Sequence, residues 1–275
     1  MGNTVNISKE EFARTKPWLF DENVTIGKEN TPLVFFVVKL GITSAFNVFI
    51  QRGFNFNMVD EFGNTPLHYA ATKSGIFVQA LVARGLDIMA HNAKGQTPLV
   101  IAVLNKRIKH IPILAEAMFI RDNDYMGPIH HAMKMKSDMK LDMVKELIRY
   151  TPALPSYWLL TYTEPVVYHL NYFANTESFP PMHLAVMTMD KTMVRLFLSM
   201  GGDMNSEYSG KTPKSILVQI GSTLRYGGIF PTDYCTRQEV MGMWAVLTKD
   251  TNVHRNVLAG ANNHTGLLSG EYKCF

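Results

Sequence analysis

Residues 65–71 read Thr65-Pro66-Leu67-His68-Tyr69-Ala70-Ala71, and weakened copies of this stretch recur along the chain at nearly regular intervals. Successive copies are 34, 32, 30, 53 and 32 residues apart when their prolines serve as markers: Pro32, Pro66, Pro98, Pro128, Pro181 and Pro213. A period in the low thirties is typical of a solenoid, in which one supersecondary unit repeats and stacks on its neighbours. The sequence therefore predicts a repeat architecture.

The repeated stretch has the chemistry of a helix start. A threonine before a proline can cap a helix with its hydroxyl, and proline at the first helical position loses no useful N–H. Thr65-Pro66 and Thr97-Pro98 are thus expected to begin helices. A second landmark is a glycine some 20 residues later, at Gly53, Gly85 and Gly202, which is expected to end a second helix in the left-handed conformation.

With both landmarks in register, residues 60–71 closely resemble the signature of ankyrin repeats, whose unit is a β-turn and two helices. The resemblance implies an all-α solenoid of about five to six helix-turn-helix units with β-hairpin-like turns, divergent capping ends and one insertion. In this family the signature histidine hydrogen-bonds within the turn. His68, His130 and His183 are therefore expected to be structural.

The repeat register predicts three regions. Residues 1–25 form a leader that caps the first repeat, residues 26–218 form the repeat array, and residues 219–275 form a capping helix and tail. The 53-residue step places an aromatic-rich insertion near 151–178. It is either a degenerate helix pair that fills its own core or a binding loop. In the fourth repeat Tyr125 occupies the place of a turn glycine, which predicts a distorted turn.

Composition argues against several other classes. The 27 Lys and Arg residues against 23 Asp and Glu give a net charge of +4, and the basic runs are short and interrupted, so no nucleic-acid partner is expected. No apolar run approaches the roughly 18 residues of a membrane span. Asn6 stands where N-myristoylation requires Ser or Thr, so lipidation of Gly2 is not expected. Two cysteines and no secretion signal predict a cytoplasmic protein, in the host cytosol if a virus or pathogen encodes it.

A search for catalytic motifs finds none, and we expect no catalytic residue, cofactor or metal site. His130 and His131 are adjacent, so on a helix they point about 100° apart and do not form a metal pair. The alternative reading is an enzyme or modifying activity in residues 219–275, with Cys235, His254 and His264 as reactive groups and the repeats as a substrate-recruiting scaffold.

The resemblance implies a non-catalytic module that binds a protein partner, and that sequesters or inhibits it, through hairpin tips and the exposed side of the first helices. Stand-alone arrays of this size occur in viruses, phages and intracellular bacteria, where they interfere with host or defence proteins. Phe62 and Tyr125 are the expected anchors, although a structural role fits Phe62 equally well. The full set of expected partner-binding residues is Glu61, Phe62, Asn64, Thr72, Lys73, Lys94, Gln96, Asn105, Lys106, Tyr125, Met126, Lys134, Lys136, Tyr157, Trp158, Thr188, Tyr208 and Lys211.

Overall fold

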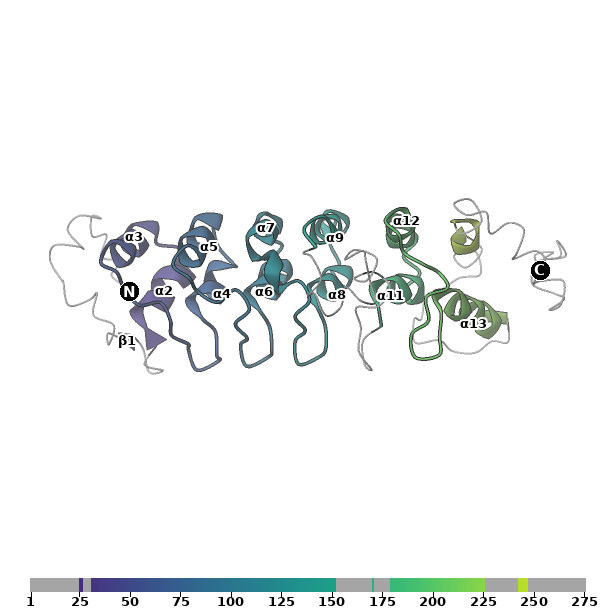
Figure 1. Ribbon diagram of the computed structural model, residues 1–275, viewed down its shortest axis with the longest axis horizontal. Coiled ribbons are helices and arrows are strands. Elements are labelled where there is room, and N and C mark those ends of the chain that lie inside the picture. The colour runs from purple at the N-terminus through teal and green to yellow at the C-terminus, as the bar shows by residue number, and fades with distance from the viewer. Residues whose placement is uncertain (1–24, 27–30, 152–169, 171–178, 226–241, 247–275) are drawn as a thin grey trace, which may run out of the picture. The chain divides into compact units, whose positions relative to one another are not determined.

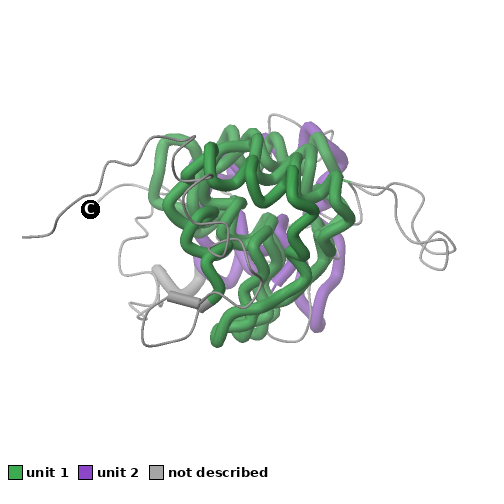
Figure 2. The backbone as a smooth tube through the Cα atoms, turned by 90° about the vertical axis from the view of Figure 1, so that its left-hand side faces the viewer, with its two compact units in different colours: residues 1–165 green, residues 166–275 purple. Residues whose placement is uncertain are grey.

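The structure is a computed structural model that describes residues 25–26, 31–151, 170, 179–225 and 242–246. The chain divides into two compact units, residues 1–165 and 166–275 (Figure 2). The division falls inside the insertion expected at 151–178. Most of that insertion, with Tyr157 and Trp158, lies outside the described residues, as do most of the expected leader and tail.

Unit 1 consists of helix pairs joined by extended turns. A two-residue antiparallel hairpin, β1 (Thr25–Ile26) with β2 (Thr31–Pro32), opens it. The first helices of the pairs are α2 (Leu33–Leu40), α4 (Pro66–Ala70), α6 (Pro98–Leu104) and α8 (Pro128–Met133). The second helices are α3 (Thr43–Gln51), α5 (Gly75–Val82), α7 (Ile111–Leu114) and α9 (Lys140–Arg149), with short 3-10 turns η2 (Ile108–His110) and η3 (Ala115–Ala117) beside α7.

The helices of unit 1 form two layers (Figure 1). The first helices α2, α4, α6 and α8 contact one another in sequence order, and each packs against its own second helix. The turns between repeats project from the first-helix layer on the side away from the second helices. This arrangement confirms the predicted all-α repeat fold, to which the short β1–β2 hairpin adds the only paired strands among the described residues.

The expected helix starts are confirmed. Pro66 and Pro98 are the first residues of α4 and α6, and the Thr97 hydroxyl accepts a hydrogen bond from the Val100 N–H at 3.4 Å. Pro112 lies in the first turn of α7, where its missing N–H costs nothing. The chain enters each helix with the geometry that these residues impose.

The core of unit 1 lies between the two layers. Leu67 of α4 and Val78 and Leu81 of α5 are fully buried, and the rings of Phe46 and Phe77 join neighbouring second helices with 4.6 Å between centroids. Small residues occupy the contacts between first helices: Ala70, Ala71, Ala102 and Ala132 are completely buried. Because alanine lets backbones approach closely, the repeats stack without gaps.

One helix end corrects the expectation for Gly202. The left-handed residue after helix α12 (Lys191–Ser199) is Gly201, with φ 89°, and it corresponds to Gly85 with φ 78°. Gly202 is required for a different reason: its N–H donates to the Phe197 carbonyl at 2.7 Å, and a Cβ there would lie 2.8 Å from that oxygen. Two adjacent glycines made the register ambiguous in the sequence.

Unit 2 repeats the same pattern. It contains the pair α11 (Pro181–Met187) and α12 (Lys191–Ser199) and a longer helix α13 (Pro213–Arg225) that contacts α11. Residues 242–246 are also helical, and Met243 and Val246 are buried there. Within the described parts of both units, every helix is too short or too polar to cross a bilayer.

Candidate functional site

The hairpins of repeats two to four are built on one local device. Asp60, Asn92 and Asp122 each stand at the base of a hairpin, and each uses one side-chain oxygen to accept two backbone N–H groups from the tip, at 2.8–3.0 Å. Short polar side chains that bond their own backbone in this way define a tight turn. The tips are therefore fixed in shape before any partner binds.

Neighbouring hairpins are also bonded to one another. The Ala93 N–H donates to the Phe62 carbonyl at 2.8 Å, and the Asn123 N–H donates to the Lys94 carbonyl at 3.0 Å. The side-chain amide of Asn92 donates to the Asn64 oxygen at 3.0 Å. These bonds join the second, third and fourth tips into one ledge, which we call the hairpin ledge (residues 60–64, 92–96 and 122–126).

The signature histidines hold the ledge to the helices. The Thr65 N–H donates to Nδ1 of His68 at 3.0 Å, so Nδ1 carries no proton and Nε2 donates to the Gln96 carbonyl of the next repeat at 2.9 Å. His130 accepts from Gly127 in the same way. His183 Nε2 contacts the Lys211 carbonyl at 3.1 Å. The expected structural role of these three histidines agrees with these bonds.

Burial keeps these rings neutral. It lowers the pKa of His68 and His183 below the ordinary value of 6.5, against the opposing effect of their backbone hydrogen bonds. His110, whose Nδ1 lies 3.1 Å from the Ala71 carbonyl, has a pKa lowered by burial as well. At His68 the neutral ring is also required by the bond that Nδ1 accepts from the Thr65 N–H, so acid is expected to break that bond, whereas donation to a carbonyl survives protonation.

A second kind of contact joins two hairpins to their first helices. The Tyr69 hydroxyl donates to Asp60 at 2.6 Å, and Nε2 of His131 lies 2.6 Å from Asp122 at the corresponding place two repeats later. Burial and the Asp60 carboxylate raise the pKa of Tyr69 to about 12. His131 is thus engaged by a carboxylate, and among the described residues no three metal-ligating side chains gather at one point.

Two aromatic side chains project from this ledge. Phe62 is 59% exposed and Tyr125 is 44% exposed. Tyr125 also has φ 59°, a left-handed conformation that the corresponding Gly63 and Gly95 adopt with φ 72° and 71°. The turn is not distorted, contrary to expectation, because Asp122 bonds its tip as Asp60 does and the Tyr125 N–H still donates to the Asp122 carbonyl at 2.9 Å.

The other predicted binding residues fall into four groups. Those that are exposed are Glu61, Lys94, Asn105, Lys106, Lys134, Lys136, Thr188 and Lys211. Those that are half-buried are Asn64, Thr72, Lys73, Gln96 and Tyr208. Met126 corrects the prediction that its side chain is free, because it is only 7% exposed and its sulfur contacts the Lys134 amine at 3.0 Å. Tyr157 and Trp158 lie outside the described residues.

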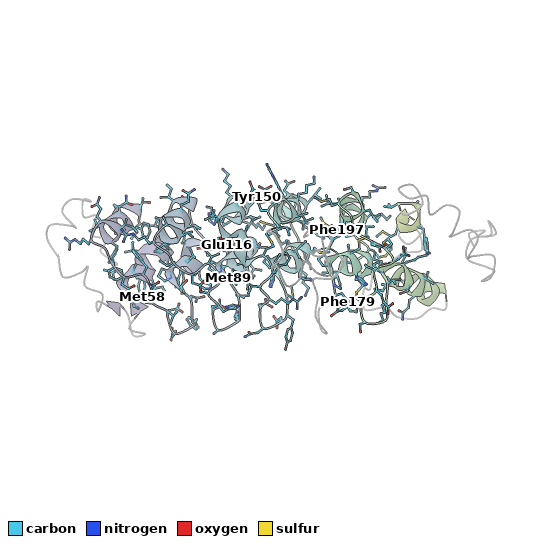
Figure 3. The ribbon with its side chains drawn as sticks, in the orientation of Figure 1. Met58, Met89, Glu116, Tyr150, Phe179 and Phe197 are labelled. Atoms are coloured by element: carbon cyan, nitrogen blue, oxygen red, sulfur yellow. The ribbon has the colours of Figure 1, made fainter. Side chains whose placement is uncertain are left out.

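A pocket that no sequence motif indicates lies beside the second hairpin. The pocket has a volume of about 270 Å³ and is lined by Phe56, Asn57, Met58, Val59, Thr65, Leu86 and Asp87. Met58 lies on the hairpin side of unit 1 (Figure 3). Val59 is 61% exposed although it is apolar. The pocket opens at the base of the hairpin that carries Phe62, where segments from two successive repeats meet, and only the three-dimensional stack brings those segments together.

Comparison with known families agrees with this geometry. A family model of ankyrin repeats, in three copies, matches residues 34–124. This match identifies residues 34–124 as ankyrin repeats. Its repeats form a module for protein–protein interaction, and the family is typically non-catalytic.

Proposed function

We propose that this protein acts by binding a protein partner on the hairpin ledge of unit 1, with Phe62 and Tyr125 as the anchors. The observation that carries the proposal is Tyr125 itself. A bulky residue in the left-handed conformation costs about 1–2 kcal/mol relative to glycine, and such outliers cluster at functional sites. Exposed aromatic rings on a rigid frame are also the residues most enriched in interface hot spots.

The pocket beside the second hairpin extends this surface. Its apolar lining reaches Val59, just before the hairpin, and Thr65, just after it, so a partner residue next to the one that contacts Phe62 has an apolar place to bury. The ledge needs no ordering on binding, because its tips are already bonded to their own bases and to one another. A preorganised surface loses less entropy on association.

We further propose that this binding takes place in the cytosol and sequesters or inhibits the partner, as a pathogen- or phage-encoded array does with a host or defence protein. The support is the fold-level resemblance together with a rigid binding ledge. A competition assay tests it: once the partner is known, saturating amounts of this protein should abolish the partner's own activity. Undiminished activity in the complex contradicts sequestration.

Purified protein is used first to capture the partner and then to measure the affinity of the complex. Partners captured from the native cell are titrated against wild type, Phe62→Ala, Tyr125→Gly and a matched control, Ile76→Ala. Ile76 is 58% exposed and lies in the second-helix layer, so it removes a comparable apolar surface away from the ledge. Each ledge variant should weaken binding roughly tenfold, and Ile76→Ala should leave it unchanged. Equal affinity in all four proteins contradicts the ledge assignment.

The rival activity in residues 219–275 concerns Cys235, His254 and His264, which lie outside the described residues. Alkylation kinetics separate the two proposals. Rapid, pH-dependent labelling of Cys235 in the native protein favours a reactive thiol, whereas protection until unfolding favours a binding protein without that chemistry.

A further inference from the structure

Charges in unit 1 are sorted between the two ends of the first helices. The connections from first to second helices, residues 39–42, 71–74, 105–110 and 134–139, contain seven Lys or Arg residues and one acidic residue, Asp138. The three hairpins at the other end, residues 60–64, 92–96 and 122–126, contain four acidic residues and one basic residue, Lys94. The sorting follows the repeat, because one basic residue recurs in each unit.

The recurring residues are Lys39, Lys73, Lys106 and Lys136, which we call the lysine row. Their spacings of 34, 33 and 30 residues follow the spacings of the repeat prolines, so each lysine falls at or just after the end of a first helix. Three of them are exposed and Lys73 is half-buried. Because α2, α4, α6 and α8 contact one another in that order, the four helix ends are neighbours along the stack.

The amines of the row are not neutralised within the described residues. Lys39 lies over the Tyr69 ring of the next repeat at 5.7 Å, and the Lys73 side chain passes close to Gly41 of the preceding repeat. Neither contact supplies a negative charge, and no ion pair is recorded for any of the four across the described part of unit 1. Packed helices lie 8–10 Å apart, which is about one Debye length at physiological salt. The fields of neighbouring lysines therefore add.

The net positive charge of the chain lies in the segment that contains the row. Residues 31–151 hold fourteen Lys and Arg against nine Asp and Glu, a net charge of +5, whereas the chain as a whole carries +4. A surface of this kind raises the local concentration of anionic partners and speeds their association.

We infer that the lysine row binds an acidic segment of the partner protein, and this inference rests on the proposed function of unit 1 as a protein-binding array. A polypeptide fits better than a nucleic acid for two reasons. Its negative charges can be confined to the segment that lies on the row, whereas the continuous phosphate charge of a nucleic acid would also meet Glu61 and Asp124, which are exposed at the opposite ends of the first helices. The exposed Phe62 and Tyr125 suit apolar side chains that accompany the acidic segment.

The test uses the full-length chain and three probes of defined charge. The probes are a fluorescein-labelled sixteen-residue peptide of alternating glutamate and serine, the same peptide with glutamine in place of glutamate, and a sixteen-nucleotide oligothymidine. Fluorescence anisotropy at 50 mM and 300 mM salt measures their affinities. The glutamate peptide should bind best, with affinity falling severalfold or more at the higher salt, and the glutamine peptide should not bind.

Two variants of equal charge localise the binding. Lys106→Asn with Lys136→Gln removes two charges from the row, and asparagine tolerates the left-handed φ of 59° at position 106. Lys145→Gln with Arg195→Gln removes two exposed charges from second helices. The row variant should lose roughly threefold or more in affinity for the glutamate peptide, while the control retains it. Circular dichroism verifies that both variants are folded.

Three outcomes overturn the inference. Equal loss in both variants shows a general charge effect, an unchanged row variant shows that the row is not used, and tighter binding of oligothymidine than of the glutamate peptide shows a nucleic-acid surface. None of these outcomes touches the hairpin ledge. That proposal fails only if Phe62→Ala and Tyr125→Gly leave the native partner bound, so the two failures are distinguishable.

Discussion

Replacement of Tyr125 by glycine should make the protein more stable while it weakens partner binding. Tyr125 has φ 59° at the place where Gly63 and Gly95 have φ 72° and 71°. The left-handed conformation costs a residue with a Cβ about 1–2 kcal/mol. Glycine avoids this cost, but it loses more backbone entropy on folding, which offsets about 0.5–1 kcal/mol of the gain. The net expectation is a gain of about 0.5–1 kcal/mol in the free energy of unfolding.

Gly85→Ala calibrates this estimate within the same unit. Gly85 has φ 78°, and no heavy atom lies within 4 Å of a Cβ placed there. The substitution therefore introduces the conformational cost alone, and it should lower the free energy of unfolding by about 0.5–1 kcal/mol. The two variants involve the same terms with opposite signs, so their effects should nearly cancel.

Urea unfolding followed by far-ultraviolet circular dichroism measures both effects. Tyr125→Gly should unfold at a higher urea concentration than wild type with an unchanged slope, and Tyr125→Phe, which keeps the left-handed backbone and the ring, should unfold near wild type. A Tyr125→Gly protein as unstable as Gly85→Ala would refute the reasoning. It would mean that contacts of the ring stabilise the fold, and that Tyr125 is in place for structure.

Three further predictions concern stability alone. Burial lowers the pKa of His68 and His110, so below pH 6.5 the unfolded chain takes up protons that the folded chain does not. The free energy of unfolding should therefore be constant above that pH and fall below it, by at most about 1.4 kcal/mol per histidine at pH 5.5. Urea midpoints at pH 7.5 and 5.5 measure this loss. Gly202→Ala should destabilise unit 2 by about 1–3 kcal/mol, because its Cβ would lie 2.8 Å from the Phe197 carbonyl; a neutral result in thermal unfolding would contradict that contact. Leu67→Ala should cost about 2–5 kcal/mol, since the side chain is completely buried between the layers, and a loss under 1 kcal/mol in urea unfolding would argue against this core.

Local chemistry made the repeat predictable. Thr-Pro pairs cap and begin helices wherever they occur, so Pro66 and Pro98 marked helix starts without any tertiary information. The histidine bonds followed from the family resemblance and are confirmed at His68. These features depend on residues a few positions apart, which a sequence displays directly.

The features that the sequence left undetermined depend on contacts between repeats or on side-chain packing. Tyr125 was expected to distort its turn, but Asp122 supplies enough hydrogen bonds to hold the tip against an unfavourable φ. Met126 was expected to be exposed, whereas its side chain is buried and its sulfur contacts the Lys134 amine. The short basic runs of the third and fourth repeats are separated in sequence from Lys39 and Lys73, and only the contacts between successive first helices make these positions neighbours.

Site-specific photo-cross-linking tests the central claim, that the hairpin ledge of unit 1 contacts the partner, most directly. A benzophenone amino acid replaces Phe62 in one protein, Tyr125 in a second and Ile76 in a third, and each is irradiated in the native cell. We expect the same partner to be cross-linked from positions 62 and 125, with little or no product from position 76. Cross-linking that is strongest from position 76, or different proteins captured from the two ledge positions, would contradict it.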